Sequence, residues 1–369
     1  MVPTMIQEIK IENYRCFKEF SLKDLKRVNL LVGKNNSGKT SIIEGINILK
    51  VPRGLMVLHD ILGARGEFLD SKRKMFAVGS LCYGYDFKSN NNISISCKNH
   101  NSHIEDVFQS GALIKEAVDK SPQLITEQID SLKYPSYPID HGVVPAIIEW
   151  SLRWKNKEIS SHTILSTDAD GGVLVNDLSN SNVTSKDCEF LPSSSFNIDK
   201  IISIYEEMIF TENEDLVIEA LQIIDPSIQK IAPVDGGTNM VVKCKGIKNR
   251  VRIGSFGDGI WRLLSLILAL VESKNRILLV DEIDTGLHFS VMEDMWRLIL
   301  KVAEKNNVQV FATTHSNDCW QSLALVMSEN PNLSHDSVSI QRIEKGKTKS
   351  VSFSEKEIIA AVNNDIEVR

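Results

Sequence analysis

The sequence predicts an α/β fold in which helices flank a mixed sheet, and three stretches of the chain predict it. A short apolar strand runs into a glycine-rich loop and then into a helix over residues 27–49. Two later apolar runs, residues 276–282 and 308–316, end in acids and in a threonine–histidine sequence. Continuous apolar runs of this length are typical of strands that are buried on both faces of a parallel sheet. Because ligands bind at the carboxyl ends of such strands, the three strand ends predict one shared site.

The composition is that of a soluble globular protein with two or three domains, or with one large domain and an insertion. The chain has 369 residues, a hydrophobic content of 42% and a formal net charge of -6. No apolar run is long enough to span a bilayer, and the N-terminus lacks the sections of a signal peptide, so we expect a cytoplasmic protein with no membrane partner. The acidic balance argues against a nucleic-acid coat protein but leaves room for a local basic patch. The six cysteines include no Cys-x-x-Cys pair, which predicts reduced, structural thiols.

The N-terminal residues predict short strands ahead of the glycine-rich loop. Residues 6–11 alternate apolar and polar side chains, which is the pattern of a half-buried strand. Residues 13–17 follow as a turn, residues 20–22 resume a strand, and residues 27–32 form the buried strand that leads into the loop.

Residues 33–40, Gly-Lys-Asn-Asn-Ser-Gly-Lys-Thr, fit the phosphate-binding P-loop pattern Gly-x-x-x-x-Gly-Lys-[Ser/Thr]. The two glycines let the backbone curl with its N–H groups pointing inward, and the following helix adds its N-terminal dipole. We expect Lys39 to reach the β- and γ-phosphates of a nucleotide and Thr40 to ligate magnesium. A turn without a ligand is the alternative, which the strand before the loop and the helix after it make the weaker one. The expected nucleotide-binding residues are Gly33, Asn35, Asn36, Ser37, Gly38, Lys39, Thr40 and Ser41.

The middle of the chain predicts an inserted α+β lobe. Residues 60–67 are typical of a loop between helices, and residues 104–132 repeat apolar side chains at helical spacing. Strands of hairpins are predicted at residues 146–154, 161–167 and 173–175. We therefore predict an N-terminal part over residues 1–99, the lobe over residues 100–185 and a C-terminal part over residues 186–369.

The C-terminal part opens with two helices over residues 199–224 and two strands at residues 228–234 and 239–244. The loop at residues 255–259, Ser-Phe-Gly-Asp-Gly, then precedes an apolar helix over residues 260–271. Two glycines, a hydroxyl and a helix N-terminus predict an anion site. It need not bind the nucleotide of its own chain, which the P-loop already holds.

Two acids, Asp281 and Glu282, follow the buried strand at residues 276–280. Asp281 is expected to hold magnesium and Glu282 to orient or polarise the attacking water. Solvated acids at the end of a core strand are the alternative, which is the weaker one beside a P-loop. His315 follows the next buried strand and is expected to face the γ-phosphate. A lone histidine more often only hydrogen-bonds within its loop, but the position of His315 after two matching elements reverses that preference.

These motifs, in this order, resemble the ATPase heads of the SMC/RecF/OLD group of ABC-type ATPases. Within that group, the chain is similar to the AAA15/AAA21-like ATPases that occur beside nucleases in bacterial anti-phage systems. The resemblance covers roughly residues 5–90 and 190–369. The matching parts are Walker A at residues 33–40, the signature loop at 255–259, Walker B at 278–282, the D-loop at 284–288 and the switch histidine His315. Residues 13–17 and 65–67 are also similar to this group, and the resemblance adds Arg15 to the nucleotide-binding residues.

The resemblance implies a P-loop NTPase of the ABC-ATPase head type, with antiparallel N-terminal strands, that binds ATP and Mg²⁺ and hydrolyses ATP slowly. It also implies a head-to-tail homodimer in which each ATP lies between one chain's P-loop and the other chain's signature loop. The signature contacts would be Ser255, Gly257, Asp258 and Gly259, with Asp284 in the D-loop. ATP would hold this dimer closed and hydrolysis would release it. Higher oligomers stay open, and only the resemblance favours ATP over GTP.

The departures from the group favour a regulatory role. OLD nucleases carry a Toprim domain after the ATPase, whereas residues 316–369 predict only helices and two strands, and no SMC-type coiled coil is predicted. We therefore expect an ATPase that senses phage infection and regulates a separate nuclease or toxin. The alternative is a RecF- or SMC-like DNA-repair or DNA-clamping ATPase, and a kinase or transporter subunit is weaker. If the chain were such a DNA-repair or DNA-clamping ATPase, the candidate DNA contacts would be Arg15, Arg27, Arg65, Lys72, Arg73 and Lys74. The negative net charge of the chain favours a solvated surface for these residues instead.

Overall fold

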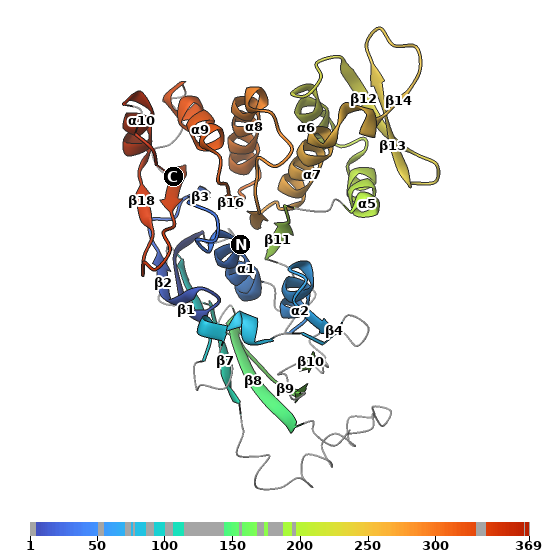
Figure 1. The fold of residues 1–369 in the computed structure, drawn as a ribbon. Coiled ribbons are helices and arrows are strands. Elements are labelled where there is room, and N and C mark those ends of the chain that lie inside the picture. The colour runs from blue at the N-terminus through green and yellow to red at the C-terminus, as the bar shows by residue number, and fades with distance from the viewer. Residues whose placement is uncertain are drawn as a thin grey trace.

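A six-stranded sheet in the order β11-β15-β16-β3-β17-β18 separates two layers of the molecule (Figure 1). Its first five strands are parallel and β18 pairs antiparallel with β17. This arrangement confirms the three predicted buried strands, which end beside one another. The strands are β3 (Val28–Val32), β11 (Cys188–Leu191), β15 (Ile277–Val280), β16 (Gln309–Thr313), β17 (Val338–Arg342) and β18 (Val351–Phe353). The computed structural model describes residues 5–50, 55–70, 75–76, 78–85, 92–99, 106–113, 144–154, 157–167, 173–175, 187–193, 197–329, 337–364 and 366–368.

Alternate residues of the central strands face different hydrophobic clusters. In β3, Leu30 and Val32 belong to one hydrophobic cluster, whereas Leu31 belongs to a second cluster around α1 (Lys39–Lys50). In β15, Leu278 and Leu279 divide in the same way. Because both faces are buried, each strand is apolar without interruption, which explains the runs in the sequence.

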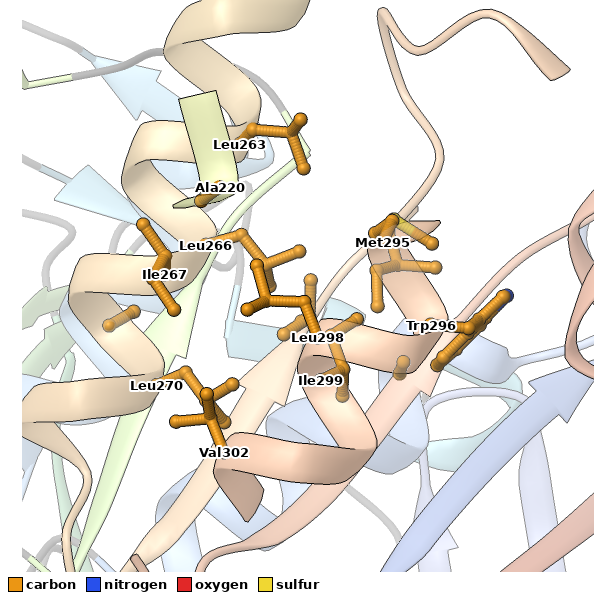
Figure 2. Packing of buried hydrophobic residues seen from close by; sticks show 14 of the residues in the cluster. Ala220, Leu263, Leu266, Ile267, Leu270, Met295, Trp296, Leu298, Ile299 and Val302 are labelled. Atoms are coloured by element: carbon orange, nitrogen blue, oxygen red, sulfur yellow. The ribbon is translucent and has the colours of Figure 1, made fainter. Parts of the chain in front are cut away.

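One layer consists of helices, which Figure 1 shows in a row from α6 to α10. On α7 (Asp258–Glu272), apolar side chains recur every three or four residues and face the apolar stripe of α8 (Met292–Lys305), as Figure 2 shows. Leu266 of α7 and Leu298 of α8 lie at the centre of this contact. Trp296 of α8 donates its indole N–H to the carbonyl of Cys319 at 2.9 Å, which fastens α8 to α9 (Asn317–Glu329).

The other layer contains α1 and a nine-stranded sheet in the order β2-β1-β6-β7-β8-β9-β10-β5-β4. All its pairs are antiparallel, which confirms the predicted antiparallel N-terminal strands. The strands are β1 (Ile6–Tyr14), β2 (Phe17–Leu22), β4 (Phe68–Asp70), β5 (Met75–Phe76), β6 (Ser94–Asn99), β7 (Asp106–Leu113), β8 (Val144–Trp154), β9 (Lys157–Thr167) and β10 (Val173–Val175). The short 3-10 turns η1 (Val78–Leu81) and η2 (Tyr83–Tyr85) also belong to this part of the chain.

The helix predicted from residue 104 is wrong over residues 106–113. These residues form β7, because pairing with β6 and β8 outweighs their helical spacing. Residues 114–132 of that prediction lie outside the described residues. Through β7 to β10, the predicted lobe continues the N-terminal sheet, while its boundaries at residues 99 and 185 stay a prediction.

The loop predicted at residues 60–67 is also wrong over most of its length. Helix α2 (Leu55–Ala64) covers it, because Val57, Ile61 and Leu62 bury one face against the cluster around α1. The helix ends at Ala64, and Gly66 behind it has a φ of 67°, which belongs to the left-handed region. The N–H of Glu67 then donates to the carbonyl of Leu62 at 3.0 Å, a hydrogen bond that is typical of glycine-terminated helices.

A smaller unit of two helices and three strands lies at the end of the helix layer that is far from α10 (Figure 1). Its helices α5 (Ile198–Met208) and α6 (Glu212–Gln222) start at Asn197 and Thr211, whose side chains accept backbone N–H groups. Its sheet is β12 (Ile228–Val234), β13 (Asn239–Cys244) and β14 (Val251–Arg252). These elements confirm the predictions for residues 199–224, 228–234 and 239–244. The 3-10 turn η3 (Ile253–Phe256) connects β14 to α7.

The remaining C-terminal elements are η4 (Phe289–Val291) and α10 (Glu355–Asn363). Ser354 and Glu357 form a capping box at the start of α10. Within the described parts of the chain, no helix has both the length and the apolar character that crossing a bilayer requires.

Candidate nucleotide-binding site

The P-loop at the end of β3 lines a cleft of about 700 Å³. Glu282 and His315, which follow β15 and β16, line the same cleft together with Thr313. The structure therefore brings together the three strand ends that the sequence predicted to share a site. Other walls come from Arg15, Cys16, Arg65, Glu67, Ser80, Tyr83, Gly84, Tyr85, Lys345 and Gly346.

Both glycines of the P-loop are required by backbone conformation and by packing. Gly33 has a φ of 146° and Gly38 a φ of 103°, which L side chains rarely adopt. A Cβ atom on Gly33 would lie 2.4 Å from the carbonyl oxygen of Ile343, and one on Gly38 would lie 2.4 Å from Cζ of Phe17. The loop can therefore curl around an anion only with glycine at both positions.

Lys39 and Thr40 begin helix α1 directly behind this loop. The ammonium group of Lys39 donates to the carbonyls of Gly33 and Lys34 at 2.7 and 3.0 Å, which folds the side chain over the loop. The Thr40 hydroxyl donates to Oδ1 of Asp281 at 3.0 Å. This hydrogen bond joins the P-loop to the end of β15, across 241 positions of sequence.

Asp281 is fixed from two sides. Its Oδ1 also accepts the hydroxyl of Thr313 at 2.7 Å, and its side chain is buried. A hydroxyl and a carboxylate oxygen 3.0 Å apart are hard donors of the kind that Mg²⁺ prefers. No group of three or more His, Cys, Asp or Glu residues in the described chain could hold a metal by itself. The donors present therefore fit Mg²⁺, which takes its remaining ligands from phosphates and water.

Glu282 and His315 face one another across the cleft. The Glu282 side chain is 41% exposed, and its Oε1 lies 3.7 Å from Nδ1 of His315. Oε2 accepts the Thr285 hydroxyl at 3.2 Å, and the backbone N–H of Glu282 donates to Oγ1 of Thr313 at 2.7 Å. Glu282 has a φ of 46°, a left-handed conformation that costs about 1–3 kcal/mol in a residue other than glycine. The carboxylate is thus accessible, oriented and held by a strained backbone.

Arg262 of α7 is a residue that sequence reasoning missed. It is 0% exposed, and its Nη2 donates to the carbonyls of Asp281 and Glu282 at 2.6 and 2.7 Å. Its Nη1 donates to the carbonyl of Pro192 at 2.8 Å. Burial lowers the pKa of Arg262 to about 10. The signal in the sequence was an arginine within the otherwise apolar helix over residues 260–271. The hydrogen bonds of Arg262 explain how the left-handed backbone of Glu282 is held.

Arg15 lines the cleft, but carboxylates hold its guanidinium. Nη1 donates to both oxygens of Glu67 at 2.7 and 2.8 Å, and Nε lies 3.7 Å from Oε2 of Glu44. Arg65 donates through Nε to Oε1 of Glu44 at 2.6 Å. Burial raises the pKa of Glu44, and the guanidinium of Arg65 opposes that effect. Sequence reasoning missed Glu44 and Glu67, and a contact between Arg15 and the nucleotide stays a prediction.

The signature residues lie in η3 and at the start of α7, away from this cleft. Ser255, Gly257, Asp258 and Gly259 are not among the described residues that line it. A Cβ atom on Gly259 would lie 2.9 Å from the carbonyl oxygen of Gly286, so the signature loop packs closely on the D-loop. Asp284 begins that D-loop, and its carbonyl accepts the N–H of Leu287 at 3.1 Å.

Two family models match successive parts of the chain. Residues 5–141 match the family described as "AAA ATPase domain". Residues 167–318 match the family described as "AAA domain, putative AbiEii toxin, Type IV TA system".

Similar proteins include an ATP/GTP phosphatase of Helicobacter pylori. It is 24% identical to this chain over 354 residues, which span 88% of this chain and 89% of that protein. The DNA replication and repair protein RecF of Chlorobium phaeovibrioides is 34% identical over 76 residues, which are 21% of this chain and 19% of RecF.

Similar solved structures include an SMC head bound to the C-winged helix domain of ScpA, with 14% identity, coverage of 95% of this chain and 97% of that one, and a TM-score of 0.48. The SMC head domain from Thermotoga maritima has 12% identity, coverage of 95% and 98%, and a TM-score of 0.43. The P-loop, the acids beside it and the two AAA matches lead to one assignment: the chain is a P-loop ATPase that is similar to the AAA families matched at residues 5–141 and 167–318.

Proposed function

We propose that the chain hydrolyses ATP in the cleft and that the ATP-bound state controls a separate effector protein. The main support for ATP hydrolysis is the 3.0 Å hydrogen bond between the Thr40 hydroxyl and Asp281 Oδ1. It places the P-loop and the strand-end carboxylate around one point, which is the arrangement that phosphoryl transfer to water needs.

In this proposal, the P-loop and the residues at the three strand ends have distinct roles. The N–H groups of the P-loop and the ammonium of Lys39 bind the β- and γ-phosphates. Thr40 and Asp281 would hold Mg²⁺, which when bound neutralises charge on the phosphate oxygens. The carboxylate of Glu282 orients a water and accepts its proton, and His315 faces the γ-phosphate from the next strand end.

The signature loop completes the site from a second chain in this proposal. The Ser255 hydroxyl, the Gly257 N–H and the N-terminus of α7 would cage the γ-phosphate of a partner's nucleotide. The position of this loop outside its own chain's cleft supports the idea. A closed dimer would then exist only while ATP is bound, so the effector would respond to the dimeric state of the chain.

Regulation of a nuclease or toxin in bacterial anti-phage defence is the biological role that we propose. Its support is the resemblance of the motifs at residues 33–40 and 278–282 to ATPases of such systems, together with the match at residues 167–318 to a family described as a putative AbiEii toxin. Slow hydrolysis suits this role, because a slow cycle prolongs the signalling state.

Substitution of Glu282 by Gln tests the catalytic assignment. We expect ATP hydrolysis to fall at least about a hundredfold, because the amide cannot accept a proton from the water. Binding of ATP, measured by calorimetry with Mg²⁺, is expected to stay within a few-fold, and sedimentation is expected to show a dimer that persists with ATP.

Glu304→Gln, at an exposed position of α8, is the matched control and should hydrolyse ATP like the parent. If Glu282→Gln also hydrolyses ATP at the parent's rate, Glu282 does not activate the water.

A DNA-repair or DNA-clamping ATPase is the second candidate, which the match to RecF favours. Of the basic residues predicted to contact DNA, Arg15 and Arg65 are engaged by Glu67 and Glu44, and Arg27 donates to Oδ1 of Asn307 at 3.1 Å. Residues 72–74 lie outside the described residues. Salt-sensitive DNA binding that requires ATP would support this candidate, and no binding at low salt with ATP would remove it.

A further inference from the structure

The unit formed by α5, α6 and β12–β14 separates its charges by element. The two helices and the turn between them carry only one basic residue, Lys200, which is paired with Glu189. Their exposed acidic side chains are Asp199, Glu206, Glu207, Glu212, Asp215 and Glu219. The sheet and its turns carry one acidic residue, Asp235, and the exposed basic side chains Lys230, Lys243, Lys245, Lys248, Arg250 and Arg252.

Few of these charges are neutralised within the described chain. Glu219 pairs with Lys301 at 2.8 Å and Arg252 with Asp235 at 2.7 Å, both at exposed positions. Among the described residues, no ion pair engages Lys245, Lys248 or Arg250 on the sheet, and none engages Glu206, Glu207 or Glu212 on the helices. The unit therefore presents one cationic and one anionic surface to solvent.

Strand register places cations next to one another on the outer face of the sheet. Lys230 of β12 lies directly opposite Lys243 of β13, and Arg252 of β14 lies directly opposite Val241. Since side chains alternate along a strand, Val241 and Lys243 share the face that is turned away from buried Val242. Like charges directly opposite one another are destabilising, so an anionic partner on this face would relieve a cost built into the sheet.

The acidic surface carries an exposed aromatic side chain. Phe210, in the turn between α5 and α6, is 97% exposed and has a φ of 65°, which is unfavourable for a bulky residue. Its N–H donates to Oε2 of Glu214 at 2.9 Å, which holds the turn. On the basic surface, Ile247 is 45% exposed between Lys245 and Lys248. Each charged surface thus has an apolar residue that could anchor a contact.

We propose that the basic outer face of β12–β14, together with the β13–β14 turn over residues 245–250, docks on the acidic α5–α6 turn of a second copy of this chain. The ring of Phe210 would lie against Ile247 and the aliphatic stems of the lysines, where ring and cations also attract one another. The contact is heterologous, because two different surfaces meet, so it can extend an assembly beyond a pair. It needs no nucleotide, and its residues differ from those of the signature contact that Ser255 would make.

A second copy fits these observations better than a nucleic acid does. A phosphate backbone would use the cations of the sheet, but it would leave the exposed Phe210 and the acids around it without a partner. A copy of the chain satisfies both surfaces at once.

Sedimentation of the full chain without nucleotide tests the contact, in a Lys39→Ala background that removes association driven by ATP. We expect concentration-dependent association at about 50 mM salt and its loss at about 500 mM, since exposed charge pairs are screened. Phe210→Ala should lower the association constant about tenfold. Circular dichroism melts show that each variant is folded.

Charge reversal makes the test specific. Lys248→Glu with Arg250→Glu should abolish association, and so should Glu207→Lys with Glu212→Lys, because each leaves one surface without its complement. An equimolar mixture of the two double variants should associate again, since each then supplies what the other lacks. Lys274→Glu with Lys305→Glu is the matched control at exposed positions outside the unit, and it should associate like the parent.

A monomer at low salt would overturn the proposal, and so would association that the reversals leave unchanged. Salt-sensitive binding of duplex DNA by a monomer, lost in Lys248→Glu with Arg250→Glu, would overturn it in favour of a nucleic-acid partner. The ATPase assay of Glu282→Gln is independent of all these outcomes, so failure here leaves the proposed hydrolysis intact.

Discussion

At the scale of single residues, Thr313 shows how few contacts organise the cleft. Its hydroxyl donates to Asp281 at 2.7 Å and accepts the N–H of Glu282 at 2.7 Å, so one side chain from β16 contacts both acids that follow β15. Thr313 and Asp281 are both buried, which keeps competing water away from the hydrogen bond. The proposed magnesium donor and the proposed water-activating carboxylate are therefore set by one neighbouring strand.

Gly38 gives the sharpest single-residue prediction for the P-loop. We expect Gly38→Ala to lose ATP binding, because the new Cβ would lie 2.4 Å from Cζ of Phe17 and 2.6 Å from Sγ of Cys16 at a φ of 103°. Calorimetric titration with ATP and Mg²⁺ measures this loss. Gly236→Ala is the control: its φ of 69° is also left-handed, but no atom lies within 4 Å of the new Cβ. ATP binding by Gly38→Ala at the parent's affinity would show that the loop relaxes around a side chain.

At the scale of elements, α7 connects the signature loop to the acids. Its N-terminus carries Asp258, and its buried Arg262 holds the carbonyls of Asp281 and Glu282. A rigid helix that ends at one motif and grips another can transmit a shift between them. Because Arg262 fixes the backbone of Glu282 rather than touching the nucleotide, it acts as a positioning residue.

Arg262→Met tests this link. We expect kcat to fall more than tenfold with KM little changed, because Glu282 loses the donor that holds its left-handed backbone. Stability to urea should fall by about 2–4 kcal/mol, since one buried and two part-buried carbonyls lose a donor. Arg297→Met removes a partly exposed arginine of α8 and its surface ion pairs, and should cost about 1 kcal/mol or less without a change in kcat. Equal kcat in the two variants would contradict a positioning role for Arg262.

The elements that the sequence predicted well are those with a local signature. A strand buried on both faces leaves a continuous apolar run, which identified β3, β15 and β16. The P-loop needs glycine wherever it occurs, so its residues were readable as a pattern. The strand β7 was missed because its conformation depends on β6 and β8, and Arg262 was missed because its partners are backbone carbonyls that carry no sequence signal.

At the scale of the whole molecule, one side chain joins the parallel sheet to the antiparallel sheet beneath the site. Gln309, at the start of β16, donates to the carbonyl of Ile6 and accepts its N–H, both at 2.8 Å, and also donates to the carbonyl of Lys26 at 2.9 Å. The antiparallel sheet is thereby fixed to the parallel sheet at a buried point. The P-loop and its acids consequently sit on a base that is fixed to both sheets, while the residues of the signature loop do not line their own chain's cleft.

If each site combines the P-loop of one chain with the signature loop of another, two defective chains should complement one another. Lys39→Ala removes the lysine of the P-loop and Ser255→Arg blocks the signature loop, so each variant alone should have no ATPase activity if both chains build each site. In an equimolar mixture about half of the dimers are mixed, and a mixed dimer has one intact site, so about a quarter of the parent's activity should return. Hydrolysis by Ser255→Arg alone at the parent's rate would show that the signature loop takes no part in the site. Activity that stays absent in the mixture would show that Lys39 and Ser255 act within one chain, because in that case no mixture contains an intact pair.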